Sequence, residues 1–84
     1  MDQDISRLTL DRPAVYRIRV QGWLDATWSD YVAGMEITTS STMQGAPITT
    51  LTGKLPDQAA LAGVLNHLYD LGLPLLAVEL DEHA

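Results

Sequence analysis

Hydrophobic and polar residues alternate along four stretches of the chain, which is the pattern of strands that bury one face. The clearest is AVYRIRVQ, where charged or polar residues separate Tyr16, Ile18 and Val20. The other three stretches are MEITTSST, ITTLTG and LLAVEL, residues 35–42, 48–53 and 75–80. The sequence therefore predicts four strands. The turn-rich MQGAP between the second and third favours their pairing as a hairpin.

A helical spacing replaces the alternation in DQAALAGVLNHLYDLG, residues 57–72. Its apolar stripe consists of Leu61, Val64, Leu65, Leu68 and Leu71. Pro56 and Asp57 are typical first residues of a helix, the one as a proline of the first turn and the other as an acidic cap. Gly72 and Pro74 indicate where this helix ends.

A second, shorter helix is predicted between the first two strands. Thr27 and Asp30 have the spacing of a capping box, and Gly34 is a natural terminator. The residues at positions i, i+3, i+4 and i+7 of an α-helix are Trp28, Tyr31, Val32 and Met35. This spacing predicts about two turns of helix with the aromatic rings on the buried face.

The predicted order is strand, short helix, strand, strand, helix, strand. This is the α+β, ferredoxin-like βαββαβ arrangement, a four-stranded antiparallel sheet with both helices on one face. Right-handed crossovers bring the first and last strands beside each other or close by. If the short helix is only an irregular turn, the alternative is a βββαβ fold with one covering helix. Residues 14–80 form the single domain, between a flexible N-terminal arm, residues 1–13, and a polar tail, residues 81–84.

The period of two divides the strand residues between the faces of the sheet. On the inner face, covered by the helices, we expect Tyr16, Ile18, Val20, Ile37, Leu51, Leu76, Val78 and Leu80. On the outer face we expect Arg17, Arg19, Glu36, Thr38, Ser40, Thr50, Thr52, Ala77 and Glu79. Cross-strand pairing with Glu36 or Glu79 would neutralise Arg17 and Arg19. The alternative is a polar dimer contact or a shallow ligand surface on which these arginines attract anions.

Small residues lie on the outward side of the longer helix, at Ala59, Ala62, Gly63 and Asn66. A mid-helix glycine costs about 1 kcal/mol relative to alanine. Close approach of a partner helix, the N-terminal arm or the short helix would offset this cost. We take these four residues as interface candidates, because a domain this small is marginally stable and oligomerisation is a common remedy.

The balance of charge excludes several classes of partner. The chain has 84 residues, no cysteine and a formal net charge of −6. From Val20 onward eight acids face only Lys54, so we expect neither nucleic acid nor an anionic membrane as a partner. No apolar run approaches the roughly 20 residues of a membrane span, and no signal-peptide pattern opens the chain. We expect a cytoplasmic protein with no metal-ligand spacing and no cofactor motif.

Few residues are candidates for chemistry. Asp30 lies beside Trp28, where capping explains it without catalysis. His67 and Asp70 are three apart on the predicted helix and can form a surface pair. Trp23 lies outside the helical stripe, so it either covers the open end of the core or lines a pocket between the short helix and the sheet.

The segments LDATWSDYVAGMEI, TTLTG, DQAALAGVLNHL and DLGLPLLAV together resemble a group of small uncharacterised bacterial proteins. Their pattern reads G-x-L-D-x-x-W-S-D-W-F-G-G-L-x-I, T-L-T-G, D-Q-A-A-L-x-G-L-L and D-L-G-L-x-L-L-S-V, and the resemblance covers residues 16–78. It departs at residues 31–34, where the pattern has W-F-G-G, and at Ala77, where it has serine. The resemblance implies that Trp28-Ser29-Asp30 and Gly63 belong to a shared pattern, and it implies no activity, cofactor or catalytic residue.

Three functions remain. The favoured one is a non-enzymatic interaction module that forms a homodimer or binds a protein partner. The second is an ACT-like sensing domain that binds a small apolar ligand near Trp23, Trp28 and Tyr31, with Asp30, Arg17 and Arg19 as further candidate contacts. The most remote is a small enzyme that uses Asp30, His67 or Asp70.

Overall fold

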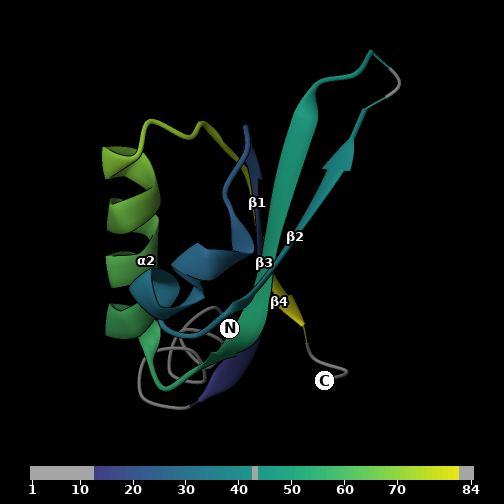
Figure 1. Ribbon diagram of the computed structural model, residues 1–84. Coiled ribbons are helices and arrows are strands. Elements are labelled where there is room, and N and C mark those ends of the chain that lie inside the picture. Colours follow the sequence, from purple (N-terminus) through teal and green to yellow (C-terminus); the bar gives the residue numbers. More distant parts are fainter. Residues whose placement is uncertain (1–12, 43, 82–84) are drawn as a thin grey trace.

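Four strands and two helices follow one another in the order predicted from the sequence. A computed structural model describes residues 13–42 and 44–81 (Figure 1). The elements are β1 (Ala14–Gln21), η1 (Ala26–Val32), β2 (Glu36–Ser41), β3 (Pro47–Leu55), α2 (Gln58–Asp70) and β4 (Leu75–Asp81). The fold is therefore α+β, and its first helix is a 3-10 helix. The predicted arm, residues 1–13, lies outside the described residues except for Pro13, and so does the predicted polar tail, residues 81–84, except for Asp81, which ends β4.

The sheet has the strand order β2-β3-β1-β4, and every pair of neighbours is antiparallel. The first and last strands are neighbours, as the crossover argument predicted. Since β1 and β2 are both antiparallel to β3, which lies between them, β1 and β2 run parallel to each other. β2 and β4 form the two edges of the sheet.

The register confirms which residues share a face. Ile18 of β1 lies opposite Leu51 of β3 and Val78 of β4, and Leu51 lies opposite Ile37 of β2. A neighbouring row on the other face runs through Glu36, Thr52, Arg17 and Glu79. One row is apolar and the next is polar, so the alternation along each strand becomes two chemically different faces of one sheet.

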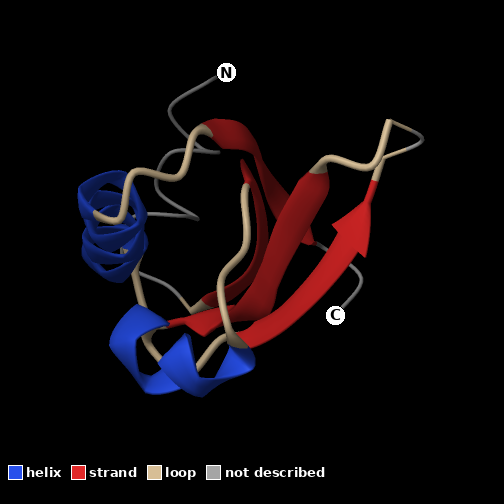
Figure 2. Ribbon diagram, turned by 45° about the horizontal axis from the view of Figure 1, so that its top comes forward, coloured by secondary structure: helices blue, strands red, loops and turns tan. Residues whose placement is uncertain are grey.

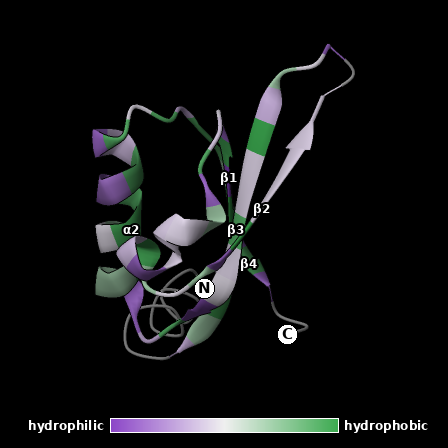
Figure 3. Ribbon diagram, in the orientation of Figure 1, coloured by the Kyte–Doolittle hydropathy of each residue, from purple (hydrophilic) through white to green (hydrophobic). Residues whose placement is uncertain are grey.

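Both helices lie on the apolar face of the sheet (Figures 1 and 2). The hydrophobic positions of α2 are on the side that faces the strands (Figure 3). The core between the layers consists of Tyr16, Ile18, Val20, Leu24, Val32, Met35, Ile37, Leu51, Leu55, Leu61, Val64 and Leu68. Burial of such side chains, at about 1.5–3 kcal/mol for each large one, holds the helices on the sheet.

The ends of α2 lie where Asp57 and Gly72 predicted them, but Pro56 precedes the N-cap and is not in the first turn as predicted. The Asp57 carboxylate accepts a hydrogen bond from the Ala60 N–H at 2.9 Å, which makes it the N-cap. At the other end Gly72 has a φ of 77°, and its N–H donates to the Tyr69 carbonyl at 2.9 Å. The Leu73 N–H donates to the Leu68 carbonyl at 3.2 Å. These two bonds form a Schellman motif, which satisfies carbonyl groups at the end of the helix.

The start of η1 differs from the prediction. Asp25, and not Thr27, is the N-cap, and its carboxylate accepts from the Thr27 N–H at 3.0 Å. The 3-10 bond from the Trp28 N–H to the Asp25 carbonyl begins the helix two residues earlier than a Thr27 cap would allow. The proposed capping box of Thr27 with Asp30 is therefore wrong.

The tighter winding of η1 also changes which residues are buried. Residues three apart line up in a 3-10 helix, so the predicted α-helical face splits into two lines. Val32 belongs to one line and is buried, whereas Trp28 and Tyr31 belong to the other and are each 41% exposed; Met35 is also buried but lies beyond the end of η1. The expectation that these aromatic rings mainly close the core is wrong.

Helix cover also stops short of β4. Leu76, Val78 and Leu80 lie on an exposed strand, although the sequence predicted that the helices would cover them. α2 packs mainly against β3 and η1, so the last strand remains outside the layer that the helix shields. A bulge between the β1 residues Arg19 and Val20 makes Leu76 the extra residue of β4.

Candidate functional site

Among the described residues, the most exposed large apolar side chains other than aromatic ones lie together on β4. They are Leu75 (53% exposed), Leu76 (50%), Val78 (39%) and Leu80 (37%), and we call them the β4 apolar surface. Among the described residues β4 pairs with β1 alone, so along residues 75–80 its other edge is available to a further strand. An edge strand with large apolar side chains combines two features that favour contact with another chain.

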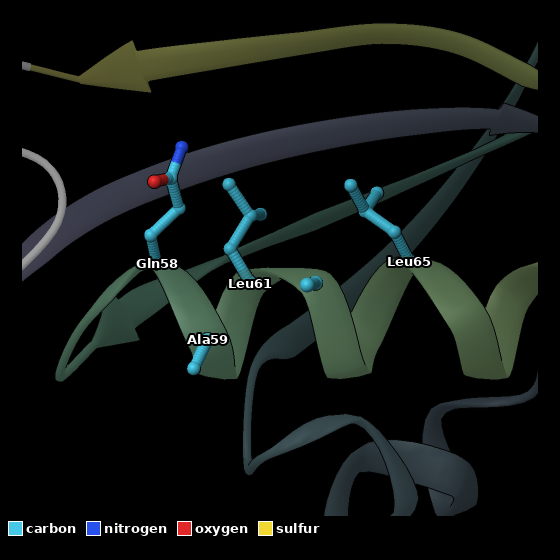
Figure 4. Close-up of a pocket in the computed structure, with 5 residues that line it drawn as sticks. Gln58, Ala59, Leu61 and Leu65 are labelled. Atoms are coloured by element: carbon cyan, nitrogen blue, oxygen red, sulfur yellow. The ribbon is translucent and has the colours of Figure 1, made fainter. Parts of the chain in front are cut away.

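A groove also runs along the surface of α2. It has a volume of about 470 Å³ and is lined by Gln58, Ala59, Leu61, Ala62 and Leu65. Figure 4 shows Gln58, Leu61 and Leu65 pointing from the helix toward the side of the sheet where β1 and β4 run. The walls are apolar except for the Gln58 amide, so this groove offers contact area and little to orient a small polar molecule.

A second groove continues the first toward the C-terminal end of α2. It has a volume of about 270 Å³ and is lined by Leu65, Asn66, Leu68, Tyr69, Leu73, Pro74 and Leu75. Leu65 lines both grooves, and Leu75 belongs to the β4 apolar surface. Leu75 therefore joins the flank of α2 to the start of the edge strand. We call the two grooves and the β4 apolar surface together the α2–β4 surface.

The small residues predicted as an interface lie along this surface. Ala59 and Ala62 line the first groove and Asn66 lines the second. Gly63 is half-buried, and a Cβ atom added there would meet nothing within 4 Å. No described residue needs the glycine for close approach, and η1 in particular does not.

The aromatic candidates lie elsewhere. Trp23 is 69% exposed, beyond the end of β1. The rings of Trp28 and Tyr31 meet edge to face at 5.2 Å, and Tyr31 lies against the His67 ring of α2 at 4.3 Å. These rings join η1 to α2, so His67 contributes to packing between the two helices. None of the aromatic candidates lines either groove, and Asp30 is exposed on η1.

Arg17 and Arg19 are engaged in cross-strand ion pairs on the outer face. Arg17 contacts Glu79 at 3.5 Å and Asp81 at 3.2 Å, and Arg19 contacts Glu79 at 3.7 Å. This confirms the predicted pairing with Glu79, while Glu36 lies opposite Thr52 and two strands away from Arg17. Both guanidinium groups are partly neutralised, which makes them less attractive to an anionic ligand.

Thr49 of β3 has a structural role that the sequence pattern did not single out. Its side chain is fully buried; the hydroxyl donates to the Gly22 carbonyl at 2.7 Å and accepts from the Leu24 N–H at 3.2 Å. These bonds fix the loop in which Trp23 points outward. The alternation of ITTLTG places Thr49 on the same face as Leu51, and a threonine among inner-face residues is the signal that identifies such a role.

Two shared segments of the resemblance have structural explanations. The Ser29 hydroxyl donates to the Met35 carbonyl at 2.7 Å, which closes the turn from η1 into β2. Gly53 of β3 lies against Met35, whose Cα atom is 3.1 Å from where a Cβ would stand. The W-S-D and T-L-T-G segments are therefore used to hold η1 and β2 against the sheet.

Comparison with known protein families gives one match, a family model described as "Domain of unknown function (DUF8691)", over residues 15–79. The chain belongs to DUF8691. The matched range is close to residues 16–78, over which the sequence resembled small uncharacterised proteins. Neither the curated proteins nor the solved structures gave a match. The family description assigns no activity to DUF8691, so function has to be argued from the surface of this chain.

Two further observations on this DUF8691 domain concern metal ions and membranes. Among residues 13–42 and 44–81, no group of three or more His, Asp and Glu side chains is placed to hold a metal ion. Within the same ranges, no helix has the length and apolar character needed to cross a membrane.

Proposed function

We propose that this DUF8691 domain is a non-enzymatic interaction module that binds a protein chain through the α2–β4 surface. The single observation that supports this most is the exposure of four large apolar side chains on an edge strand. Apolar patches of this kind mark interaction sites when they are contiguous, and here the grooves along α2 extend the patch.

The backbone of β4 supports the same proposal. Natural proteins commonly protect an edge strand with inward-pointing charges, prolines or a covering element. The charged residues of β4, Glu79 and Asp81, belong to the outer face and are paired with Arg17. The inner face of β4 has only aliphatic side chains, so an added strand would gain both hydrogen bonds and apolar contact.

The arrangement of the strands supports the ferredoxin-like class, with η1 in place of the first α-helix. β1 and β2 are parallel with β3 inserted between them, which is the split β-α-β arrangement. In this variant the short η1 covers the β2 side, and within residues 13–42 and 44–81 no second α-helix lies over β4. We infer that the exposed surface results from this shortened first helix and from the position of α2.

A small-molecule-sensing role has less support. The aromatic candidates Trp23, Trp28 and Tyr31 line neither groove, and the grooves are shallow and apolar. Catalysis by Asp30, His67 or Asp70 has no geometric support beyond the packing of His67 on Tyr31. The cytoplasmic location and the exclusion of nucleic acid and membranes stay predictions from composition.

Photo-crosslinking from the two edges of the sheet tests the proposal. A photoreactive phenylalanine analogue placed at Leu76 on β4 is expected to give a covalent adduct with a protein chain in cells. The matched control is the same residue at Thr39, which is exposed on β2, the other edge. Adducts from Leu76 but not from Thr39 would support the α2–β4 surface. Equal yields at both positions, or none at either, would show that this surface does not bind proteins.

A further inference from the structure

We propose that the protein bound at the α2–β4 surface is a second copy of this chain. The two copies pair through β4 in antiparallel orientation, about a two-fold axis that passes near Val78. This inference rests on the interaction function proposed above and adds the identity of the partner and the register. It would join two four-stranded sheets into one of eight strands.

The sequence of β4 is self-complementary about Val78. In Leu76-Ala77-Val78-Glu79-Leu80 the large apolar residues are the first, the third and the fifth. In an isologous contact each residue meets the residue at the mirrored position in the other copy. Leu76 then lies opposite Leu80 of the second copy, and Val78 lies opposite Val78. Both ends of the contact therefore receive a pair of leucines, and aliphatic side chains pair across the whole inner face.

Charge on the outer face favours the same register. Around Val78, each Glu79 lies opposite Ala77 of the second copy, so no two carboxylates oppose each other. An axis at Glu79 would place two Glu79 carboxylates face to face, and an axis at Leu80 would place Glu79 opposite Asp81. Like charges directly opposite each other in a sheet are destabilising.

The first residues of β4 disfavour registers in which the two-fold axis is shifted toward the N-terminal end of the strand. An axis at Leu76 would centre the contact on the bulge and bring Pro74 into the ladder. Proline has no N–H to donate, and a bulge disrupts regular pairing. The register around Val78 keeps residues 77–79, which pair regularly with β1, at the centre of the contact. The bulge residue Leu76 then lies at the two ends of the contact, opposite Leu80, and not at its centre.

The opposite edge of the sheet lacks these features. β2 exposes Thr38, Thr39, Ser40 and Ser41, and its large aliphatic side chain, Ile37, is buried. A β2 contact would therefore bury hydroxyl groups and no large apolar side chain. This makes β2 a matched control for any experiment on β4.

The net charge predicts how salt changes the association. Each copy has a formal net charge of −6, so two copies repel each other at long range. The contact itself is aliphatic, with its carboxylates paired inside each chain. Added salt screens the repulsion and leaves the apolar contact intact, so the dimer dissociation constant should fall severalfold between low and moderate salt.

Single cysteines test the register, because the natural chain has none. Wild-type chain measured by light scattering over a concentration series should reach twice the monomer mass of 9.2 kDa. Val78→Cys should then form an intermolecular disulfide, or be bridged by a short bis-maleimide. Ala77→Cys and Glu79→Cys should cross-link efficiently only when the two variants are mixed. Thr39→Cys on β2 should remain uncross-linked throughout.

The outcomes separate this inference from the proposed function. A monomeric chain that still gives Leu76 adducts with another protein would overturn the second copy and leave the interaction function standing. A dimer in which Thr39→Cys cross-links and Val78→Cys does not would overturn the β4 pairing. A monomer without adducts from Leu76 would contradict both. A dimer with the expected cross-links, lost in Val78→Asp while that variant remains folded by circular dichroism, would support both.

Discussion

The two edge strands of the same sheet differ in what they expose. β2 has the sequence EITTSS and presents hydroxyl groups to solvent, with Ile37 buried. β4 has the sequence LLAVELD and presents Leu75, Leu76, Val78 and Leu80. Within the described part of the chain, each of these strands pairs with one neighbouring strand. The comparison shows that an edge position alone does not make a binding surface; the side chains that remain uncovered decide it.

The difference comes from where the helices lie. η1 contacts β2 and covers Ile37, so the single large apolar residue of that strand joins the core. α2 packs against β3 and η1, which leaves the inner face of β4 open beside the grooves. In β2 the helices cover the large apolar side chain of the inner face, so no apolar surface remains to be buried. In β4 the large apolar side chains extend beyond the helices, so apolar surface remains that another chain could bury.

Truncation of one aliphatic side chain on each edge strand should give the largest difference in the free energy of unfolding. Ile37→Ala is expected to lower the free energy of unfolding by at least about 2 kcal/mol, because it leaves a cavity beneath η1. Val78→Ala should lower it by less than about 1 kcal/mol, since Val78 already has partial access to water. Urea denaturation at low protein concentration measures both. If both variants lose the same free energy of unfolding, the Val78 side chain is buried in solution even at low protein concentration.

A smaller effect is expected in the turn that leads into β2. Ala33 has a φ of 60° and is followed by Gly34 at 73°, and the pattern that this chain resembles has glycine at both positions. A left-handed alanine costs about 1–2 kcal/mol, partly offset by its lower entropy in the unfolded chain. Ala33→Gly should therefore raise the free energy of unfolding by about 0.5–1 kcal/mol.

Gly34→Ala is the matched control for that turn. A Cβ at Gly34 would meet nothing within 4 Å, so any loss of stability in this variant comes from the backbone conformation. We expect a loss of about 1 kcal/mol, opposite in sign to the effect at Ala33. Thermal unfolding of both variants side by side measures the pair. A destabilised Ala33→Gly would show that alanine is unstrained in this turn.

The smallest effect should come from the ion pairs that join β1 to β4. Arg17→Gln removes contacts with Glu79 and Asp81 but leaves a long side chain on the outer face. Exposed pairs of this kind contribute up to about 1 kcal/mol, and we expect a loss within that range. Arg19→Gln, with one contact at 3.7 Å, should lose less. Chemical denaturation in 1 M salt should show no loss of free energy of unfolding in either variant, because salt screens the ion pairs. A loss that persists in 1 M salt would mean that the arginine stabilises the fold by something other than charge pairing.

Much of the fold followed from local pattern. The alternation around Ile18 and Leu51 placed them on one face, and the structure pairs them directly. Asp57 and Gly72 marked the ends of α2 because each residue type satisfies backbone groups that a helix leaves free. The pairing of Arg17 with Glu79 followed from the same period of two. These signals depend on adjacent residues or on the two-residue repeat of a strand, so they can be interpreted without knowledge of the whole fold.

The errors arose where two signals competed. The spacing of Trp28 and Tyr31 fits the apolar stripe of an α-helix. The chain instead forms a 3-10 helix with Asp25 as its N-cap, and both aromatic rings remain partly exposed to solvent. The candidate surface was also only partly anticipated. Ala59, Ala62 and Asn66 were predicted to face a partner, whereas Leu76, Val78 and Leu80 were predicted to be covered. Periodicity tells which face of a strand is apolar and gives no measure of how far a helix reaches across the sheet.

The amino-acid sequence by itself determined the order of elements, the two faces of the sheet, the ends of α2 and the acidic balance of charge. Each depends on residue type and spacing within a few positions. Tertiary structure alone decided that η1 packs on β2, that Thr49 fixes the loop before η1, and that α2 leaves the large side chains of β4 exposed. Those outcomes depend on helix length and on where the layers meet, because burial is a property of two surfaces in contact and a sequence pattern describes only one of them.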